Sequence, residues 1–202
     1  MRIGVLGTGM VGRAISGKLA ELGHDVRVGS RTEGDGAVVF ADAAAHGEVV
    51  FNCTAGTASL EAIAAAGEDN VAGKPLVDVA NPLDFSGGGP ALFTTSTESL
   101  GERIQAAFPA ARVVKALNTI NCNLMVDPAA VPGDHVVFVC GDDDAAKQQA
   151  AALLGEFGWP AERVIDLGDI TAARATEMYL MLWLRLMGVV GGPSFNIALA
   201  RT

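Results

Sequence analysis

The chain has 202 residues, of which 50% are hydrophobic and 18% are charged, and its formal net charge is −9. This length and apolar content suffice for a complete α/β core, either as one domain or as one domain with a small appendage. The acidic balance argues against nucleic acid or an anionic membrane as a partner, because such a chain repels phosphate groups at long range. Any anionic ligand must therefore meet a local basic spot.

The cysteines and the apolar segments bear on the compartment. Cys53, Cys122 and Cys140 lie far apart without a CxxC pair, which favours reduced, buried thiols in a cytoplasmic protein. The N-terminal residues enter a strand-like run at once, so we expect no leader peptide. The apolar segment Met178–Leu184 is followed by Arg185 and is too short to span a bilayer.

Short apolar runs alternate along the chain with alanine-rich stretches of helical character. The expected strands are Ile3–Leu6, Asp25–Gly29, Val49–Cys53, Leu76–Val79, Val113–Ala116, Val136–Cys140 and Arg163–Ile165. The expected helices are Met10–Leu22, Ser59–Ala66, Glu98–Phe108, Asp143–Phe157 and Ile170–Val189. Fully apolar strands that are each followed by a helix predict a Rossmann-like, doubly wound, mostly parallel sheet. We expect residues 1–168 to form this domain and residues 169–202 a small C-terminal helical element.

A glycine fingerprint, Gly7-x-Gly9-x-x-Gly12, follows the first expected strand and opens the first expected helix. In such a loop the first glycine permits a tight turn, the second lets the backbone approach a pyrophosphate, and the third allows close packing of helix and strand. The helix N-terminus then offers free N–H groups and a positive dipole end to the phosphates. The strand–loop–helix–strand context predicts a dinucleotide site.

The end of the second expected strand indicates which dinucleotide binds. The sequence there is Gly29-Ser30-Arg31-Thr32, where an acidic residue would accept a hydrogen bond from a ribose 2′-OH and repel a 2′-phosphate. A serine hydroxyl and an arginine guanidinium instead donate to phosphate oxygens, and Thr32 adds one more donor. The sequence therefore predicts NADP(H) rather than NAD(H).

Two loops, residues 81–90 and 118–123, follow expected strands at the edge where open α/β sheets bind ligands. Lys115 ends the strand before the second loop, and it is a candidate for an anion contact or a proton donor; a solvated strand-end lysine is an equally open interpretation. Asn118 is a further candidate for a substrate contact.

No catalytic side chain and no metal site are predicted, since none of the three histidines is placed as a general acid and no ligand cluster has metal spacing. The run Asp142-Asp143-Asp144 is better explained as a helix N-terminus. Hydride transfer from a nicotinamide to a flavin-like ring needs mainly positioning and exclusion of water, so it tolerates the lack of such a group.

The last expected helix is apolar nearly all round, which predicts that it is buried. It could form a wall against a flat aromatic ligand or an interface between two subunits, and ordinary core packing remains open. We expect a homodimer.

Four stretches together resemble the NADP-dependent oxidoreductases that act on the deazaflavin coenzyme F420. They are "GVLGTGMVGRAISGKLAELGHDVRVGSR", "VDVANPLDF", "VKALNTIN" and "TEMYLMLWLRLMG…FNIALAR", in the order of that family, and the likeness runs from Arg2 to Arg201. The resemblance implies hydride transfer between NADP(H) and F420, a small-molecule co-substrate. It places Thr8, Gly9, Met10 and Val11 at the phosphates and Ser30 and Arg31 at the 2′-phosphate.

The same resemblance implies that Thr54 and Ala55, after the third strand, and Asn81 and Pro82, after the fourth, line the nicotinamide end. The family often carries a lysine shortly after the Ser-Arg pair, whereas the residues from Thr32 to Gly36 contain none. Two alternatives stay open: an NADPH-dependent reductase of another flavin-like or small acceptor, and a non-catalytic NADPH-binding sensor.

Overall fold

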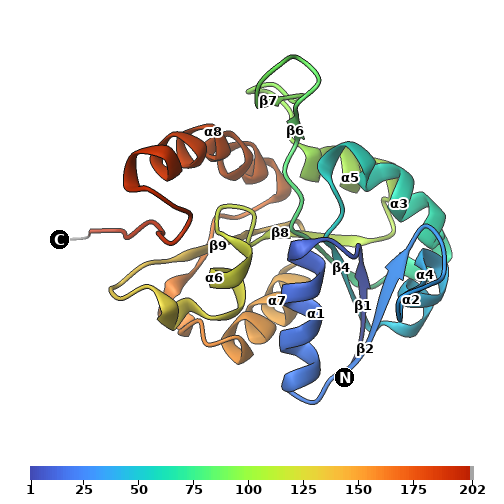
Figure 1. Cartoon of the computed structure of the whole chain (residues 1–202). Helices are drawn as coiled ribbons and strands as arrows, with labels where there is room; N and C mark the ends of the chain where they lie inside the picture. Colours follow the sequence, from blue (N-terminus) through green and yellow to red (C-terminus); the bar gives the residue numbers. More distant parts are fainter. Residues whose placement is uncertain (201–202) are drawn as a thin grey trace.

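The computed structural model describes residues 1–200; the last two residues of the expected C-terminal element, 201 and 202, lie outside the described part. An eight-stranded sheet of order β10-β9-β8-β5-β4-β1-β2-β3 forms its centre (Figure 1). The strands are β1 (Arg2–Leu6), β2 (Asp25–Ser30), β3 (Val38–Val39), β4 (Val49–Asn52), β5 (Pro75–Asp78), β8 (Arg112–Ala116), β9 (Val137–Cys140) and β10 (Val164–Asp166). Neighbouring strands are parallel except β8 and β9, which confirms the mostly parallel, Rossmann-like class.

The strand order contains a reversal beside β1. The chain runs from β1 outward through β2 to β3, and then returns to place β4 on the other side of β1. Leu6 at the end of β1 is level with Gly29 of β2 and Asn52 of β4, so the loops that follow these three strands meet at one edge. Open α/β sheets bind ligands in the crevice at such a reversal.

Helices cover both faces of the sheet (Figure 1). One face carries α1 (Met10–Glu21), α6 (Cys122–Val126) and α7 (Asp144–Glu156), and the other carries α2 (Phe40–His46), α3 (Ser59–Ala66), α4 (Glu68–Val71), α5 (Leu100–Ala107) and the start of α8 (Ala173–Val190). Ile15 and Trp159 lie in the first core, and Ile63 and Ile104 in the second. The strands are buried on both sides, which explains their uninterrupted apolar runs.

Several short elements were not predicted. They are β3, α2, α4, α6, the antiparallel hairpin of β6 (Leu83–Asp84) and β7 (Ala91–Leu92), and the 3-10 turns η1 (Gly56–Ala58), η2 (Pro128–Ala130) and η3 (Ala161–Arg163), whereas the turn η4 (Ile170–Ala172) falls within the expected helix Ile170–Val189. Each has at most seven residues, too few to show a hydrophobic period. The hairpin projects from the body of the molecule at the ligand edge of the sheet (Figure 1).

Helix ends follow the expected chemistry. Asp143 accepts a hydrogen bond from the backbone N–H of Ala146 at 2.8 Å and caps α7, as predicted for the aspartate run. Asp169 accepts from the N–H of Thr171 at 2.9 Å at the start of η4, which leads into α8. Gly191 ends α8 with a φ of 80°, the left-handed conformation that glycine adopts most readily.

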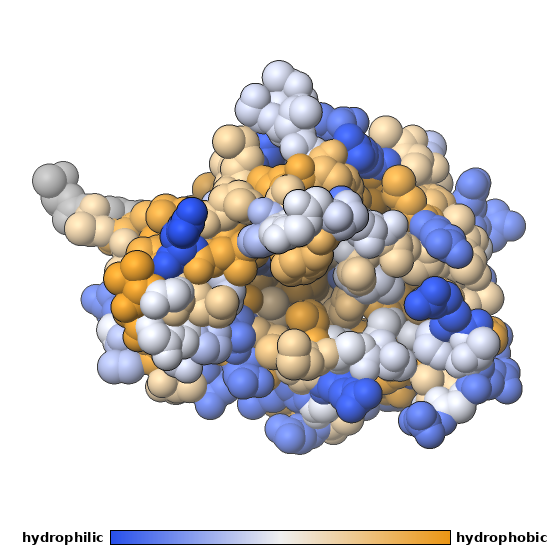
Figure 2. Space-filling model, turned by 45° about the horizontal axis from the view of Figure 1, so that its top comes forward, coloured by the Kyte–Doolittle hydropathy of each residue, from blue (hydrophilic) through white to orange (hydrophobic). Residues whose placement is uncertain are grey.

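Within this chain the last helix is buried on one face only, so core packing does not account for its apolar residues. Its packed face presents Ala173, Thr176, Glu177 and Leu180, and the helix then runs past the body that covers this face. The large apolar residues that it exposes are Met178, Met181, Leu182, Val189 and Val190. Figure 2 shows the hydrophobic surface gathered on the side of the molecule where Figure 1 places α8. Within residues 1–200, no helix combines the length and apolarity needed to cross a membrane.

Candidate functional site

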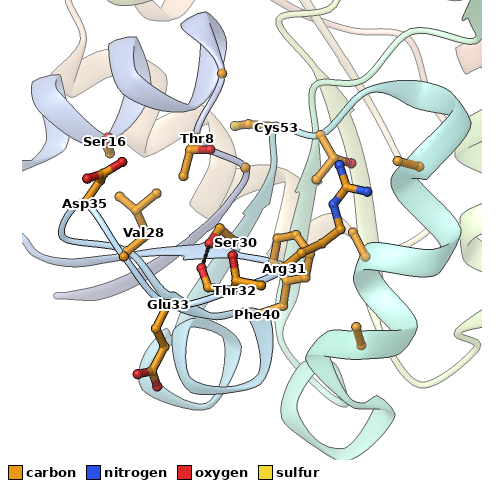
Figure 3. Close-up of a pocket in the computed structure, with 18 of the residues that line it drawn as sticks. Thr8, Ser16, Val28, Ser30, Arg31, Thr32, Glu33, Asp35, Phe40 and Cys53 are labelled. Carbon is orange, nitrogen blue, oxygen red and sulfur yellow. Dashed lines mark hydrogen bonds between the residues drawn. The ribbon is translucent and has the colours of Figure 1, made fainter.

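A cavity of about 960 Å³ opens where β1, β2 and β4 end (Figure 3). Its wall includes the first glycine loop, the end of β2 and the residues after β4, and its volume suits a nucleotide-sized ligand. Eight of the predicted cofactor residues line it: Gly7, Thr8, Gly9, Ser30, Arg31, Thr32, Thr54 and Ala55. The reversal in strand order thus brings three separate segments of the prediction to one cavity.

The glycine loop has the backbone geometry that the fingerprint predicts. Gly7 has a φ of 116°, and a Cβ on Gly12 would stand 2.0 Å from the carbonyl oxygen of Gly7. A Cβ on Gly9 would meet no heavy atom within 4 Å, so the outer side of Gly9 is open to a ligand. Gly9 is the N-cap of α1 and no side chain caps this helix, so the first N–H groups remain available for a phosphate.

The donors at the end of β2 lie in two directions. Ser30 and Thr32 face each other, and the Ser30 hydroxyl donates to the Thr32 carbonyl oxygen, while Arg31 extends away from them toward α3 (Figure 3). Arg31 is exposed and takes part in none of the ion pairs found within residues 1–200. A phosphate at this corner would meet a free guanidinium, and it would compete with the carbonyl of Thr32 for the Ser30 hydroxyl.

A second arginine on the cavity wall was not predicted. The Arg13 side chain turns back along α1, and its Nε donates to the carbonyl oxygen of Thr8 at 2.8 Å. The bond anchors this guanidinium beside the glycine loop. In the sequence, the signal for a cavity contact was the position of Arg13 directly after Gly12. The cavity also carries three acids, Glu33, Asp35 and Glu61, so its charge is mixed rather than uniformly positive.

The other predicted cofactor residues lie outside the cavity wall. Met10, Val11 and Gly12 form the first turn of α1, where only their backbone could serve a phosphate. Asn81 and Pro82 follow β5 at the neighbouring part of the sheet edge, and Pro82 is buried.

Asn118 ties two loops of the ligand edge together. The Asn81 side chain donates to the carbonyl oxygen of Asn118 at 2.7 Å, and the Asn118 side chain donates to Oδ1 of Asn81 at 3.1 Å. Asn118 is only 4% exposed, so its amide positions the loops and presents little surface to a substrate. The preceding Leu117 has a φ of 64°, which costs a branched residue about 1–2 kcal/mol and indicates that the surrounding packing fixes this turn.

Lys115 does not reach the ligand edge, and this corrects both expectations for it. Its side chain is fully buried, and Nζ lies 2.7 Å from Oδ2 of Asp78 and 2.8 Å from Oε1 of Glu177. It also donates to the carbonyl oxygen of Ala80. Burial alone would lower the pKa of Lys115, but the two carboxylates outweigh it and hold this pKa above its ordinary value. The ammonium group is a charged structural centre, neither a ligand contact nor a solvated lysine.

The histidines have structural partners. His24 lies 2.9 Å from a carboxylate oxygen of Glu156, and ring nitrogens of His46 and His135 lie 3.0 Å from backbone carbonyl oxygens. Within residues 1–200, no group of three His, Cys, Asp or Glu side chains is arranged to hold a metal ion.

Two of the three cysteines are inert thiols. Cys53 and Cys140 are buried, and this burial raises the pKa of both, that of Cys140 to about 12. Their thiols therefore stay protonated and unreactive near neutral pH. Cys122 is half-buried.

The sheet order, the open glycine loop and the donors at the end of β2 define the class of dinucleotide-dependent Rossmann proteins. Residues 2–82 match the model of the family described as NADP oxidoreductase, coenzyme F420-dependent. A crystal structure from Arthrobacter sp. FB24, provisionally named an F420-dependent NADP-reductase, is 50% identical with full coverage of both chains and a TM-score of 0.93. The chain belongs to this family of NADP-dependent oxidoreductases.

Two further relatives set the limits of the likeness. The metalloreductase STEAP3 of Rattus norvegicus is 30% identical over 188 residues, which are 87% of this chain but only 36% of that protein. A reductive aminase from Aspergillus terreus, solved with NADPH, is 19% identical with a TM-score of 0.65, and the match covers 94% of this chain and 62% of that one. The second likeness shows a shared fold alone.

Proposed function

We propose that the protein transfers a hydride between NADP(H) and the deazaflavin coenzyme F420. The observation that carries the nucleotide half is the free Arg31 guanidinium beside Ser30 at the end of β2, in a cavity whose glycine loop is open at Gly9. Membership of the F420-dependent family supports the acceptor half.

Binding of the nucleotide follows from this chain's own groups. The N–H groups at the start of α1 and the positive end of its dipole suit the pyrophosphate, and Arg31 and Ser30 suit a phosphate on the 2′ position. Thr54 and Ala55, beside the glycine loop, would then orient the far end of the nucleotide. The cavity fits the group because it is open, nucleotide-sized and furnished with donors on two sides.

The affinities for NADPH and NADH test the nucleotide half of the proposal. The variant Arg31→Ala should raise the Kd of NADPH about 10- to 100-fold, the loss of a charged hydrogen bond worth ~1.5–3 kcal/mol, and leave the Kd of NADH unchanged. Arg27→Ala is the matched control, since Arg27 is exposed on β2, the strand that Arg31 follows, and does not line the cavity. Equal affinities of the wild type for NADH and NADPH would overturn the assignment.

The reaction requires little side-chain chemistry. Bound NADPH would supply the hydride, and F420 would take it up together with a proton from solvent, to give NADP⁺ and the reduced deazaflavin. The protein contributes position and the exclusion of water, which the part of α8 around Met178 and the loops after β5 and β8 would provide.

Reduction of the deazaflavin can be followed directly through its absorbance. Purified protein mixed with NADPH and oxidised F420 should bleach the deazaflavin absorbance, and Arg31→Ala should raise the KM for NADPH more than it lowers kcat. No bleaching with F420, in a protein that binds NADPH, would contradict the acceptor assignment.

A second candidate is an NADPH-dependent reductase of another flavin-like acceptor. The observation that favours it is the pairing of basic residues: Lys147, Arg163 and Arg174 each make ion pairs with nearby carboxylates. They offer little to the anionic tail of F420. Bleaching of riboflavin or FMN, without bleaching of F420, would support this candidate. Tight NADPH binding without reduction of any of these acceptors would support a sensor.

We also propose that α8 forms a homodimer interface. Leu182 is 55% exposed and Val189 is 86% exposed on the apolar surface of this helix. Contiguous exposed apolar surface commonly marks a site of association, and a two-fold interface would bury the same helix from both copies. Sedimentation equilibrium should give twice the chain mass, and Leu182→Glu should halve it. Leu60→Glu, which changes an exposed leucine on α3, is the control. A monomeric wild type would contradict the proposal.

A cytoplasmic location is proposed on the state of the cysteines. Cys53 and Cys140 are buried with raised thiol pKa values, which suits a protein that folds with reduced thiols. Fractionation of the native host would test it.

A further inference from the structure

A buried polar network connects the nucleotide cavity with α8. Its centre is Lys115, whose ammonium group lies 2.7 Å from Asp78 and 2.8 Å from Glu177. The three side chains come from β8, β5 and α8, and none is more than 1% exposed. One positive and two negative groups leave a formal charge of −1 in the interior, which demands further compensation.

The compensation comes from α5, at the α8 end of the network. The Glu177 carboxylate accepts hydrogen bonds from the backbone N–H groups of Leu100, at 2.7 Å, and Gly101, at 3.0 Å. These residues form the first turn of α5, where the partial positive charge of the helix dipole is concentrated. Glu177 is the only acid in α8, and its side chain links this helix directly to the first turn of α5 and to Lys115 of β8.

The other end of the network reaches the cavity wall. Asn52, at the end of β4, donates from Nδ2 to Oδ1 of Asp78 at 2.8 Å. Its Oδ1 accepts from the hydroxyl of Thr54 at 2.7 Å and from the backbone N–H of Thr54 at 3.3 Å. Thr54 lines the nucleotide cavity. An unbroken series of hydrogen bonds and ion pairs therefore runs from the cavity to α8.

Stability alone is a poor reason for such an arrangement. Apolar residues of similar volume commonly replace buried ion pairs with no loss of stability, whereas satisfied polar networks specify one geometry. The network also controls the start of a ligand-edge loop, since Lys115 donates to the carbonyl oxygen of Ala80, next to Asn81.

We propose that Lys115 and Glu177 are positioning residues, which hold α8 and the Thr54 loop in one relative arrangement. The same buried charges then set both the nicotinamide end of the nucleotide site and the helix that faces the acceptor. The assignment of α8 to the acceptor rests on the proposed function; the coupling between α8 and the nucleotide site does not.

The variant Lys115→Met tests the centre of the network, and Lys147→Met is its matched control. Lys147 also pairs with two carboxylates, Asp144 at 3.1 Å and Asp166 at 2.9 Å, and its side chain is 9% exposed, but its group touches neither the cavity nor α8. Three quantities are measured in the full chain: the midpoint of thermal unfolding, the Kd of NADPH, and hydrogen exchange of the α8 amides relative to those of β1 and β4.

Lys115→Met should raise the Kd of NADPH at least fivefold and speed α8 exchange at least tenfold relative to the core strands. Lys147→Met should lower the thermal midpoint and leave the other two quantities at wild-type values. If Lys115→Met does not fold, Glu177→Gln carries the test, since it keeps the side-chain shape and the Lys115–Asp78 pair. It should speed α8 exchange at least threefold and raise the KM of the acceptor more than it lowers kcat.

The proposal is overturned if the network variants lose stability but match Lys147→Met in NADPH affinity and relative exchange of α8. Neither readout uses an acceptor, so a failure of F420 reduction leaves this test intact. A wild type that binds no NADPH would instead refute the proposed function, and α8 exchange would still decide the role of the network.

Discussion

The two ends of the ligand edge are built in different ways. At β1 and β2 the site is mostly backbone: Gly7 and Gly12 pack against each other, Gly9 is open, and no side chain caps α1. At β5 and β8 the edge is held by buried charges, with Lys115 between Asp78 and Glu177. The geometry of the first end therefore depends on glycines, which have no Cβ atom. The geometry of the second end depends on every partner of the buried Lys115 ammonium group being present. This difference leads to separate expectations for mutations at each end.

The largest effect is expected at the charged end. Glu177→Ala removes one partner of Lys115 and leaves two buried N–H groups of α5 without an acceptor, so the free energy of unfolding should fall by about 3–5 kcal/mol. Urea unfolding measures it. Glu48→Ala is the control, since the contacts of Glu48 with Arg2 are half exposed, and it should give a far smaller change. A similarly small change for Glu177→Ala would show that the charged end is no more sensitive than the surface.

At the backbone end, two alanine variants should separate stability from binding. Gly12→Ala should lower the free energy of unfolding by about 1–3 kcal/mol, because the new Cβ would meet the carbonyl oxygen of Gly7. Gly9→Ala should cost less than about 1 kcal/mol, because its Cβ meets nothing, and yet it should raise the Kd of NADPH at least about tenfold. Urea unfolding and NADPH titration of both variants decide it. Unchanged NADPH affinity in Gly9→Ala would show that the pyrophosphate does not lie against this loop.

The same contrast explains what could be predicted from the sequence. The glycine loop and the Ser30–Arg31 corner are encoded by short contiguous segments, so the class of the sheet and most of the cavity wall could be predicted from local pattern. The network of Lys115 was not predicted, because its partners Asp78, Ala80 and Glu177 come from two distant segments and nothing near Lys115 in the sequence reveals them. Arg13 left a signal, its place after Gly12, but only the folded side chain shows that it turns toward Thr8.

The apolar pattern of α8 did not reveal what would cover the outer face of this helix. The composition of α8 predicts burial on all sides. Periodicity, however, cannot distinguish a helix that is buried within its own chain from one that is covered by a second copy or by a ligand. In the described part of the chain the outer face, with Leu182 and Val189, is exposed. The short hairpin of β6 and β7 likewise could not be predicted, since two residues per strand carry no alternation.

A second link between α5 and α8 should give a smaller, pH-dependent effect. The Arg174 guanidinium, with help from Ser99, holds the pKa of Glu102 below its ordinary value of 4.5. Because the folded-state pKa is depressed, the stabilisation is complete above pH 4.5 and is lost as the pH falls through the lower folded value. Glu102→Gln should therefore be about 1–2 kcal/mol less stable than wild type at pH 7, and this difference should shrink toward pH 3.

Urea midpoints measured between pH 3 and pH 7 test this expectation. Carboxylates whose lowered pKa values do not depend on Glu102, such as Glu48 and Asp84, are common to both proteins and cancel in the difference. A difference that stays constant with pH would assign the effect to the helix cap of Ser99 rather than to the charge on Glu102.

The smallest effect is expected at Arg13, and it would refine the description of the backbone end. Its Nε is already bonded to the Thr8 carbonyl oxygen, so its remaining N–H groups lie beside the glycine loop rather than at the Ser30–Arg31 corner. Arg13→Ala should therefore raise the Kd of NADPH and of NADH alike, by about 3- to 10-fold, since both share the pyrophosphate. Arg31→Ala should affect NADPH alone. If Arg13→Ala instead weakened only NADPH, its guanidinium would act on the 2′-phosphate and would replace the lysine that the segment after Arg31 lacks.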